Sequence, residues 1–209
     1  MGTLHLCRHP LVADALALLR DRDCPPEAFR RQLRRLALVL GQEAAAGLRT
    51  TPIEVRTPLA PCRGERLAGR LALVPVLRAG LGLVEGLLDL LPEAEVWHLG
   101  LFRDEATLEP VEYYSRLGGS PPPGDAFLLD PMLATGGTAV AAVAALRRWG
   151  VERIRFVGVL GAPAGVEALQ RHDPGVEIHL AALDPELDER GYILPGLGDA
   201  GDRQYRTGS

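Results

Sequence analysis

The sequence predicts an α/β fold with one central parallel sheet flanked by helices. Short apolar runs typical of buried strands alternate along the chain with helical patterns, which is the order that parallel sheets require. The chain has 209 residues, enough for one domain with a sizeable core. A glycine-rich segment at 127–138 follows one of the apolar runs, and sheets of this kind bind ligands at the carboxyl ends of their strands.

A long amphipathic helix is expected first, in residues 25–48. Prolines stand at its start, where the missing backbone N–H is harmless. Its apolar residues recur at helical spacing. They form one stripe of Phe29, Leu33, Leu36, Leu40 and Ala44. This helix is also a candidate interface between subunits.

Strands and helices are then expected to alternate to residue 181. The apolar runs that predict strands lie at 71–77, 94–102, 126–130, 154–160 and 176–181. The segments that predict helices lie at 80–91, 139–149 and 164–171. We find neither internal repeats nor a low-complexity linker, so one domain over 1–209 is expected.

Two segments do not fit the alternation. Residues 102–125 are polar and proline-rich around a short apolar centre, and we expect them to form a two-stranded arm that projects from the sheet. Residues 191–209 are rich in glycine, which predicts little regular structure. Because Tyr192, Ile193 and Leu197 are too apolar for a solvated tail, we expect this segment to cover a binding site as a hood.

Composition argues against several classes of protein. The formal net charge of −4 provides no general attraction to nucleic acid or to an anionic membrane. No apolar run is long enough to span a bilayer, and the first residues lack the pattern of a secretory signal, so a cytoplasmic location is expected. The three widely spaced cysteines suit a reducing compartment.

The sequence contains no lysine, since all 23 of its Lys and Arg residues are arginine. A pyridoxal-phosphate enzyme needs a lysine for its Schiff base, and a P-loop needs one to reach the nucleotide phosphates. The glycine-rich segment therefore requires a different explanation.

Residues 130–138 have the chemistry of a site for a ribose 5-phosphate. Glycines let backbone N–H groups turn inward, Thr135 and Thr138 add hydroxyl donors, and the following helix directs its positive end at the same place. The dipole contributes ~0.3–2 kcal/mol, whereas each hydrogen bond to a charged group gives roughly 1.5–3 kcal/mol, so the donors dominate. Asp130 cannot attract phosphate but can accept hydrogen bonds from sugar hydroxyls. An ordinary turn with a helix-capping threonine is the alternative.

The segment LLDPMLATGGTA, residues 128–139, resembles the phosphoribosyl diphosphate (PRPP) loop of type I phosphoribosyltransferases, in the form found in the uracil branch of that family. Three further segments are similar to the same branch in the expected order, and a weaker fifth match is HPLV. The three segments are 74–88, 100–114 and 191–203. Together these matches run through most of the chain.

The resemblance implies the type I phosphoribosyltransferase fold and the reaction of PRPP with uracil to give UMP and diphosphate. It also implies Mg²⁺ bound mainly through the diphosphate, with no dedicated protein ligands. A homodimer or larger homo-oligomer is expected. Some relatives are activated by GTP, and no motif in this sequence decides whether GTP is a partner here.

The resemblance also implies roles for individual residues. Those expected to bind PRPP are Arg78, Arg103, Asp130, Pro131, Met132, Leu133, Ala134, Thr135, Gly136, Gly137, Thr138 and Asp199. Those expected to contact uracil are Ile193, Gly198, Asp199 and Ala200. Arg103, Asp130 and Asp199 are expected to be catalytic, and Asp199 is the acid nominated as a base.

Arginine suits the diphosphate because its planar guanidinium binds phosphate oxygens in pairs. Taken alone, Arg78 could be a surface arginine after a strand, and Arg103 could belong to a surface cluster of ion pairs. In relatives, the loop that holds Arg78 often contains a non-proline cis peptide bond.

Three alternative functions stay open at this stage. An RNA-binding regulator on the same fold would need a basic face, which the net charge does not support. A purine or orotate transferase is disfavoured by Ala134 and by the PGLGDAG segment. A catalytically silent PRPP-binding subunit is disfavoured by the presence of Arg78, Arg103 and Asp130.

Overall fold

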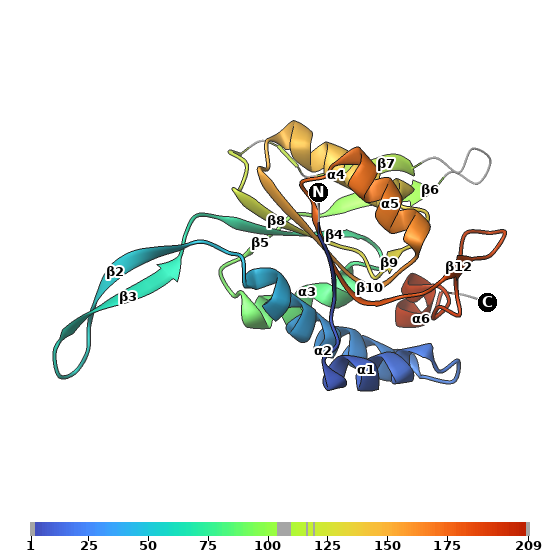
Figure 1. The fold of residues 1–209 in the computed structure, drawn as a ribbon, viewed down its shortest axis with the longest axis horizontal. Coiled ribbons are helices and arrows are strands. Elements are labelled where there is room, and N and C mark those ends of the chain that lie inside the picture. Colours follow the sequence, from blue (N-terminus) through green and yellow to red (C-terminus); the bar gives the residue numbers. More distant parts are fainter. Residues whose placement is uncertain (1–2, 104–109, 116, 119, 208–209) are drawn as a thin grey trace.

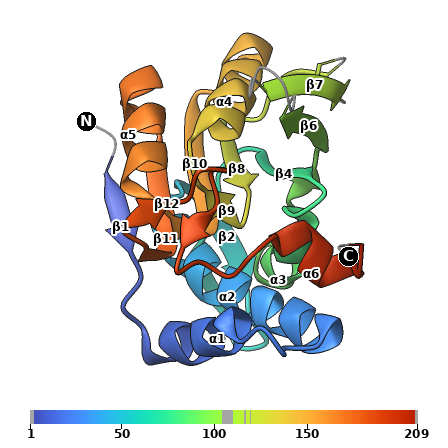
Figure 2. The same ribbon diagram turned by 90° about the vertical axis from the view of Figure 1, so that its right-hand side faces the viewer.

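The structure is a computed structural model that describes residues 3–103, 110–115, 117–118 and 120–207, with the backbone alone at 102, 103 and 110. Within these residues a central sheet separates two layers of helices (Figures 1 and 2). The predicted α/β architecture is confirmed. No helix in the described part of the chain is both long and apolar enough to cross a membrane.

The central sheet is parallel except at one edge. Its strand order is β1 (Leu4–Leu6), β11 (Glu177–Leu183), β10 (Arg153–Gly161), β8 (Asp125–Leu129), β4 (Leu71–Leu77), β6 (Leu99–Arg103) and β7 (Pro110–Ser115). Only the edge pair β6–β7 is antiparallel. The strand predicted at 94–102 is interrupted, because β5 (Glu95–Val96) and β6 pair separately with β4.

The helices lie on both faces of the sheet, as expected. One face carries α1 (Pro10–Arg20), α2 (Pro26–Ala45) and α3 (Leu81–Leu90), and the other carries α4 (Gly137–Trp149) and α5 (Pro163–His172) (Figure 2). Helix α2 is the predicted amphipathic helix, and all five residues of its stripe are buried. Helix α1 lies in the amino-terminal quarter, which was expected to be helical, but the sequence analysis gave bounds only for the helix at 25–48.

The central strands are apolar on both sides because each side faces a separate core. On β8, Phe127 and Leu129 pack in the core with α2 and α3, whereas Leu128 packs in the core with α4. This is the usual composition of a strand in a doubly covered parallel sheet.

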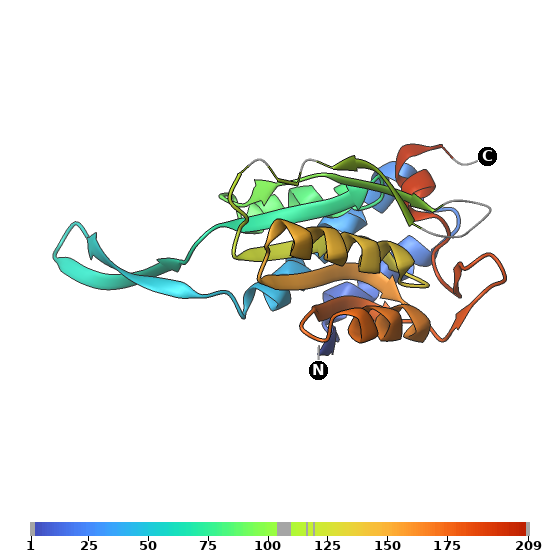
Figure 3. The ribbon, with the colours of Figure 1, turned by 90° about the horizontal axis from the view of Figure 1, so that it is seen from above.

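A two-stranded arm stands away from the body, at a place that the sequence analysis missed. It is the antiparallel hairpin of β2 (Thr50–Arg56) and β3 (Pro61–Leu67), whose residues are mostly exposed (Figures 1 and 3). The segment 102–125, predicted to be the arm, holds the end of β6 and all of β7, and this antiparallel pair continues the main sheet. Residues 104–109 of that segment lie outside the described residues.

The expectation of little regular structure after residue 191 is wrong. Strand β13 (Ile193–Leu194) pairs with β12 (Glu186–Leu187), and α6 (Ala200–Tyr205) follows. Asp199 caps this helix by accepting a hydrogen bond from the N–H of Asp202 at 2.8 Å. The helix is also held by burial of Ala200 and Gln204. Local glycine content concealed a helix that tertiary packing stabilises.

Candidate active site

A cavity of about 380 Å³ lies between the loop that follows β8 and the C-terminal segment. The predicted residues that line it are Asp130, Met132, Leu133, Ala134, Thr135, Gly136, Thr138, Ile193, Gly198, Asp199 and Ala200. The two predicted binding segments, more than fifty residues apart in the chain, therefore share one cavity. Figure 2 shows the C-terminal elements beside β9 (Met132–Leu133) at the carboxyl side of the sheet.

The loop from Asp130 to α4 is shaped by short local contacts. Asp130 accepts a hydrogen bond from the N–H of Met132 at 3.2 Å, and β9 then pairs with β10. Gly136 adopts φ 86°, a left-handed conformation that favours glycine, and α4 begins at the next residue. The N–H groups in the first turn of α4 have no partner within the helix, which makes them available to an anion.

Glycine at 136 is also required by its neighbours. A Cβ atom built there would lie 2.8 Å from the Cβ of Ala168 and 2.9 Å from the carbonyl oxygen of Gly165. Both belong to α5, so this helix supports the loop from behind. Sequence analysis could identify the glycine but not the helix that packs against it.

The Asp130 side chain borders the cavity and is half-buried. Burial raises its pKa to about 7, the hydrogen bond from Met132 opposes this shift, and the nearby Asp199 carboxylate adds to it. The cavity therefore brings together the two acids that were predicted to be functional.

Arg78 lies at the turn between β4 and α3 and does not line the cavity as defined above. Its guanidinium donates to Asp202 Oδ1 and to Thr207 Oγ1, each at 3.0 Å. The peptide bond Leu77–Arg78 is cis, as the resemblance to the family led us to expect. The turn is tight, because a Cβ atom on Gly80 would lie 2.3 Å from the carbonyl oxygen of Leu129.

Besides Arg78, three predicted residues are not among the lining residues. Pro131 lies in the loop and Gly137 is the first residue of α4, and each stands between two lining residues. Arg103 ends β6, and its side chain lies outside the described residues. Its predicted contact with diphosphate stays a prediction.

Several residues that sequence analysis missed hold the C-terminal segment in place. Arg20 of α1 forms two hydrogen bonds with the carboxylate of Asp184, at 2.6 and 2.7 Å, and a third with the carbonyl of Gly196 at 2.8 Å. Asp184 also accepts from the Gly196 N–H at 2.9 Å, and the pair with Arg20 lowers its pKa. This network fixes the turn before the predicted uracil contacts.

Two side chains of α6, Arg203 and Gln204, also bind it to the rest of the protein. Arg203 donates to the carbonyls of Leu19, Asp21 and Leu197, and its guanidinium lies over the ring of Phe29. Gln204, which is fully buried, donates to the carbonyl of Ala79 at 3.1 Å. The turn that carries Arg78 is thereby joined to α6. No local signal reveals these contacts, because their partners are 125 or more residues apart in most cases.

Six residues beyond the predicted set also contribute to the cavity wall. Three of them precede β13, namely Arg190, Gly191 and Tyr192, and the others are Ala79, Ala139 and Gly201. The sequence analysis identifies Tyr192 only as an apolar residue in a segment expected to be irregular. Its position suits a side chain that borders a flat, partly apolar ligand.

Comparison with known proteins adds a consistent result. The family model for uracil phosphoribosyltransferase matches residues 6–207. The chain is 54% identical to the uracil phosphoribosyltransferase of Roseiflexus sp. (strain RS-1), with both chains covered completely, and 47% identical to that of Streptococcus pneumoniae (strain TIGR4), with 99% and 100% covered.

Solved structures agree with the fold. The AQ2163 protein of Aquifex aeolicus superimposes with a TM-score of 0.93 at 36% identity, covering 98% of this chain and 99% of the other. A hypoxanthine phosphoribosyltransferase of Staphylococcus aureus gives a TM-score of 0.50 at 13% identity, covering 75% and 76%. The second similarity concerns the fold alone.

Proposed function

The chain belongs to the uracil phosphoribosyltransferase family, and we propose that it carries out the family's reaction in the cavity between residues 130–138 and the C-terminal segment. The reaction joins the ribose 5-phosphate of PRPP to N1 of uracil, giving UMP and diphosphate. The chain is therefore a pentosyltransferase of pyrimidine salvage. The single observation that supports this location is the shared cavity of the two segments.

The loop at 135–138 is proposed to hold the 5-phosphate. The positive end of α4 and its first N–H groups face this position, and the hydroxyls of Thr135 and Thr138 add donors. Asp130, which directly follows β8, is proposed to accept hydrogen bonds from the ribose hydroxyls through its carboxylate. Its pKa of about 7 makes this binding sensitive to pH.

The C-terminal segment is proposed to bind the base. Uracil presents two carbonyl oxygens and one N–H along its edge, and the backbone around Gly198 and Ala200 can offer the matching donors and an acceptor. Gly198 has φ 77°, so this turn depends on glycine. Cytosine reverses two of these hydrogen bonds. At roughly 1–3 kcal/mol for each unsatisfied buried group, discrimination reaches about 10²–10⁴.

The reaction develops positive charge on the ribose and negative charge on the departing diphosphate. Arg78, which directly precedes the cavity-lining residue Ala79, is proposed to stabilise the diphosphate, together with Arg103. Asp130 and Asp199 are proposed to lie near the ribose, where their negative charge would stabilise the growing positive charge. Correct positioning of the two substrates supplies much of the remaining acceleration.

Mg²⁺ is compatible with the donors at this site. Asp130 and Asp199 offer carboxylate oxygens beside the cavity, and hard cations prefer oxygen ligands. The described residues contain no group of three candidate ligands there, so a metal here would be held largely by substrate oxygens. When bound, it supplies positive charge that neutralises the diphosphate.

Three further expectations stay predictions about this chain. We propose that it forms a homodimer or a larger homo-oligomer, that it acts in the cytoplasm, and that GTP be tested as an activator. The family assignment supports all three as hypotheses.

A base-panel assay tests the proposed function. Purified protein is incubated with PRPP, Mg²⁺ and either uracil, cytosine, hypoxanthine or orotate, and nucleotides are separated by chromatography. We expect UMP from uracil alone, with activity lost in Arg78→Ala and Asp130→Ala. Nucleotide formed from another base, or none from any base despite measurable PRPP binding, would contradict the proposal. The second result would favour the RNA-binding alternative.

A further inference from the structure

A second group of chemically active side chains lies on the sheet, away from the catalytic cavity. It consists of His5 on the edge strand β1 and of Glu177 and His179 on the neighbouring strand β11. None of the three lines the cavity. Glu177 and His179 lie in the amino-terminal half of β11, whereas the cavity is at the carboxyl side of the sheet.

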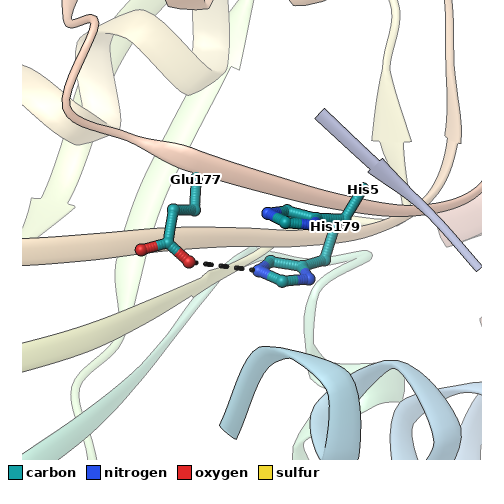
Figure 4. A group of neighbouring side chains, drawn as sticks. All are labelled: His5, Glu177 and His179. Atoms are coloured by element: carbon teal, nitrogen blue, oxygen red, sulfur yellow. Dashed lines mark ion pairs between the residues drawn. The ribbon is translucent and has the colours of Figure 1, made fainter. Parts of the chain in front are cut away.

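The topology brings the three side chains to one face. His5 and His179 are direct partners in the parallel register of β1 and β11, so their side chains leave the sheet on the same side. Glu177 is two residues before His179, and strand geometry puts residues i and i+2 on one face. Figure 4 shows the two imidazoles lying parallel, with the carboxylate of Glu177 directed toward the ring of His179.

The distances are close to those of a metal site. The imidazole centroids are 4.5 Å apart, and Glu177 Oε2 is 3.7 Å from His179 Nε2. One potential ligand atom from each residue lies within 4.8 Å of the others. Tetrahedral coordination at about 2.1 Å needs ligand atoms roughly 3.4 Å apart. Because the two rings are stacked, the His5 ring must also turn so that its nitrogen points at the shared position, and the partial exposure of His5 and Glu177 leaves both side chains room to turn.

His179 provides an independent reason to expect a ligand. Its residue is 3% exposed, and neither ring nitrogen has a hydrogen-bond partner within the described structure. Buried polar side chains are nearly always paired, so two unpaired nitrogens in one ring need an explanation. A metal ion on Nε2 would satisfy the nitrogen that faces Glu177.

One cation already competes for Glu177. Arg155 Nε lies 3.4 Å from Glu177 Oε2, but this arginine has stronger bonds elsewhere, to Asp125 at 2.9 Å and to the carbonyl of Gly47 at 3.0 Å. A metal at Glu177 would displace only the longest of these contacts. Asp125 stays beside Arg155 and offsets the repulsion between the guanidinium and a dication.

We propose that His5, Glu177 and His179 form a binding site for a divalent transition metal such as Zn²⁺. Two imidazoles and one carboxylate match the preference of Zn²⁺ for nitrogen and oxygen ligands, with a fourth position left for water. The bound ion would join edge strand β1 to β11. It would therefore stabilise the attachment of the amino-terminal strand and leave the catalytic cavity unchanged.

The test is Zn²⁺ binding to untagged protein that has been treated with a chelator and then dialysed. Titration calorimetry should give one ion per chain, and Zn²⁺ should raise the midpoint of thermal unfolding. His5→Ala and Glu177→Gln should each weaken binding at least tenfold and abolish the thermal shift. His172→Ala, which removes an exposed histidine on α5, is the matched control and should bind as the wild type does.

Co²⁺ provides a second readout that does not depend on stability. A tetrahedral Co²⁺ absorption spectrum should appear in the wild type and in His172→Ala, and should be lost in His5→Ala. UMP formation should be equal in all four proteins, which confirms that the variants are folded. Absence of binding, or binding that survives in His5→Ala and Glu177→Gln, would overturn the proposal. The latter result would place the ion elsewhere, for instance on the exposed Cys62.

Discussion

The guanidinium of Arg78 donates a hydrogen bond to the carboxylate of Asp202, with 3.0 Å between Nη2 and Oδ1. Thr207 joins the same group, since its hydroxyl accepts from Arg78 and donates to Asp202 at 2.6 Å. The end of the chain thus sets the direction of an arginine that is proposed to bind diphosphate. Arg78 and Asp202 come from segments 124 residues apart.

Asp202→Ala should raise the KM for PRPP without a comparable change in the KM for uracil. The ion pair is substantially exposed, so we expect it to contribute about 0.2–1 kcal/mol, which corresponds to a roughly 1.4–5-fold rise. Steady-state kinetics with each substrate varied in turn measures this. Asp14→Ala removes a similar acceptor from Arg35, far from the cavity, and should change neither KM. A PRPP KM below that of the wild type would show that Asp202 competes with diphosphate.

Asp130→Asn should stabilise the protein at pH 8. The pKa of Asp130 is raised from 3.8 to about 7 in the folded protein, so its ionisation opposes folding. The penalty is absent below the unfolded pKa, grows as the pH rises between these two values, and is complete above the folded one. The gain at pH 8 should be on the order of 1–4 kcal/mol and should vanish near pH about 4. Urea unfolding across this pH range measures it.

The asparagine keeps an oxygen that can accept from the Met132 N–H, so the loop should retain its shape. The same variant should nevertheless lose PRPP binding and activity, because an amide is a weaker acceptor for ribose hydroxyls than a carboxylate is. In the wild type, PRPP binding should weaken as the pH falls through about 7. An equal stability gain at pH about 4 and pH 8 would contradict this interpretation of Asp130.

Gly136→Ala should lower both stability and PRPP affinity. Its positive φ is unfavourable for alanine, and the added Cβ meets Ala168 and the Gly165 carbonyl at less than 3 Å. We expect a loss of about 2–4 kcal/mol, from strain and overpacking together. Gly69→Ala separates the two causes, because φ there is 77° and nothing lies within 4 Å of the new Cβ. It should cost about 1 kcal/mol. Equal losses in the two variants would rule out the contact with α5.

Asp184→Asn should loosen the segment that is proposed to bind uracil. The Asp184 carboxylate pairs with Arg20 and accepts a hydrogen bond from the Gly196 N–H. Because these contacts lower the pKa of Asp184 in the folded protein, their stabilisation is present above the unfolded pKa and is lost as the pH falls through the folded pKa. We expect a loss of about 1–3 kcal/mol at neutral pH, with the KM for uracil rising more than the KM for PRPP. Thermal unfolding and kinetics measure the two effects.

Asp173→Asn is the matched control for that variant. Asp173 forms a similar ion pair with Arg147, at 2.7 Å, near the carboxyl ends of α4 and α5, and neither residue lines the cavity. Its replacement should lower stability while both KM values stay at the wild-type level. If Asp184→Asn also changed only stability, the network around Gly196 would have no part in binding the base.

The sequence could predict the parts of this fold that depend on local patterns. Continuous apolar runs such as 71–77 predict doubly covered strands, because each face of the strand meets its own core. The loop at 130–138 was found because glycines, threonines and an acid follow such a run directly. These features need no knowledge of distant residues.

The missed features depend on contacts between distant segments or have weak local signals. Helix α6 contains Gly201 and Asp202, two residues of low helix propensity. It is stabilised instead by the burial of Gln204 against the turn that carries Arg78. The bond between Arg20 and Asp184 joins residues 164 positions apart. The exposed hairpin β2–β3 lacks the alternating apolar face by which half-buried strands are predicted.

The most direct test of the central claim is a crystal structure of the protein with UMP. The phosphate should lie against the backbone N–H groups at 135–138, the ribose hydroxyls against Asp130, and the uracil edge against 198–200. This result would establish that one cavity holds both ends of the product. UMP bound outside the cavity, or with its base at the 135–138 loop, would contradict the account.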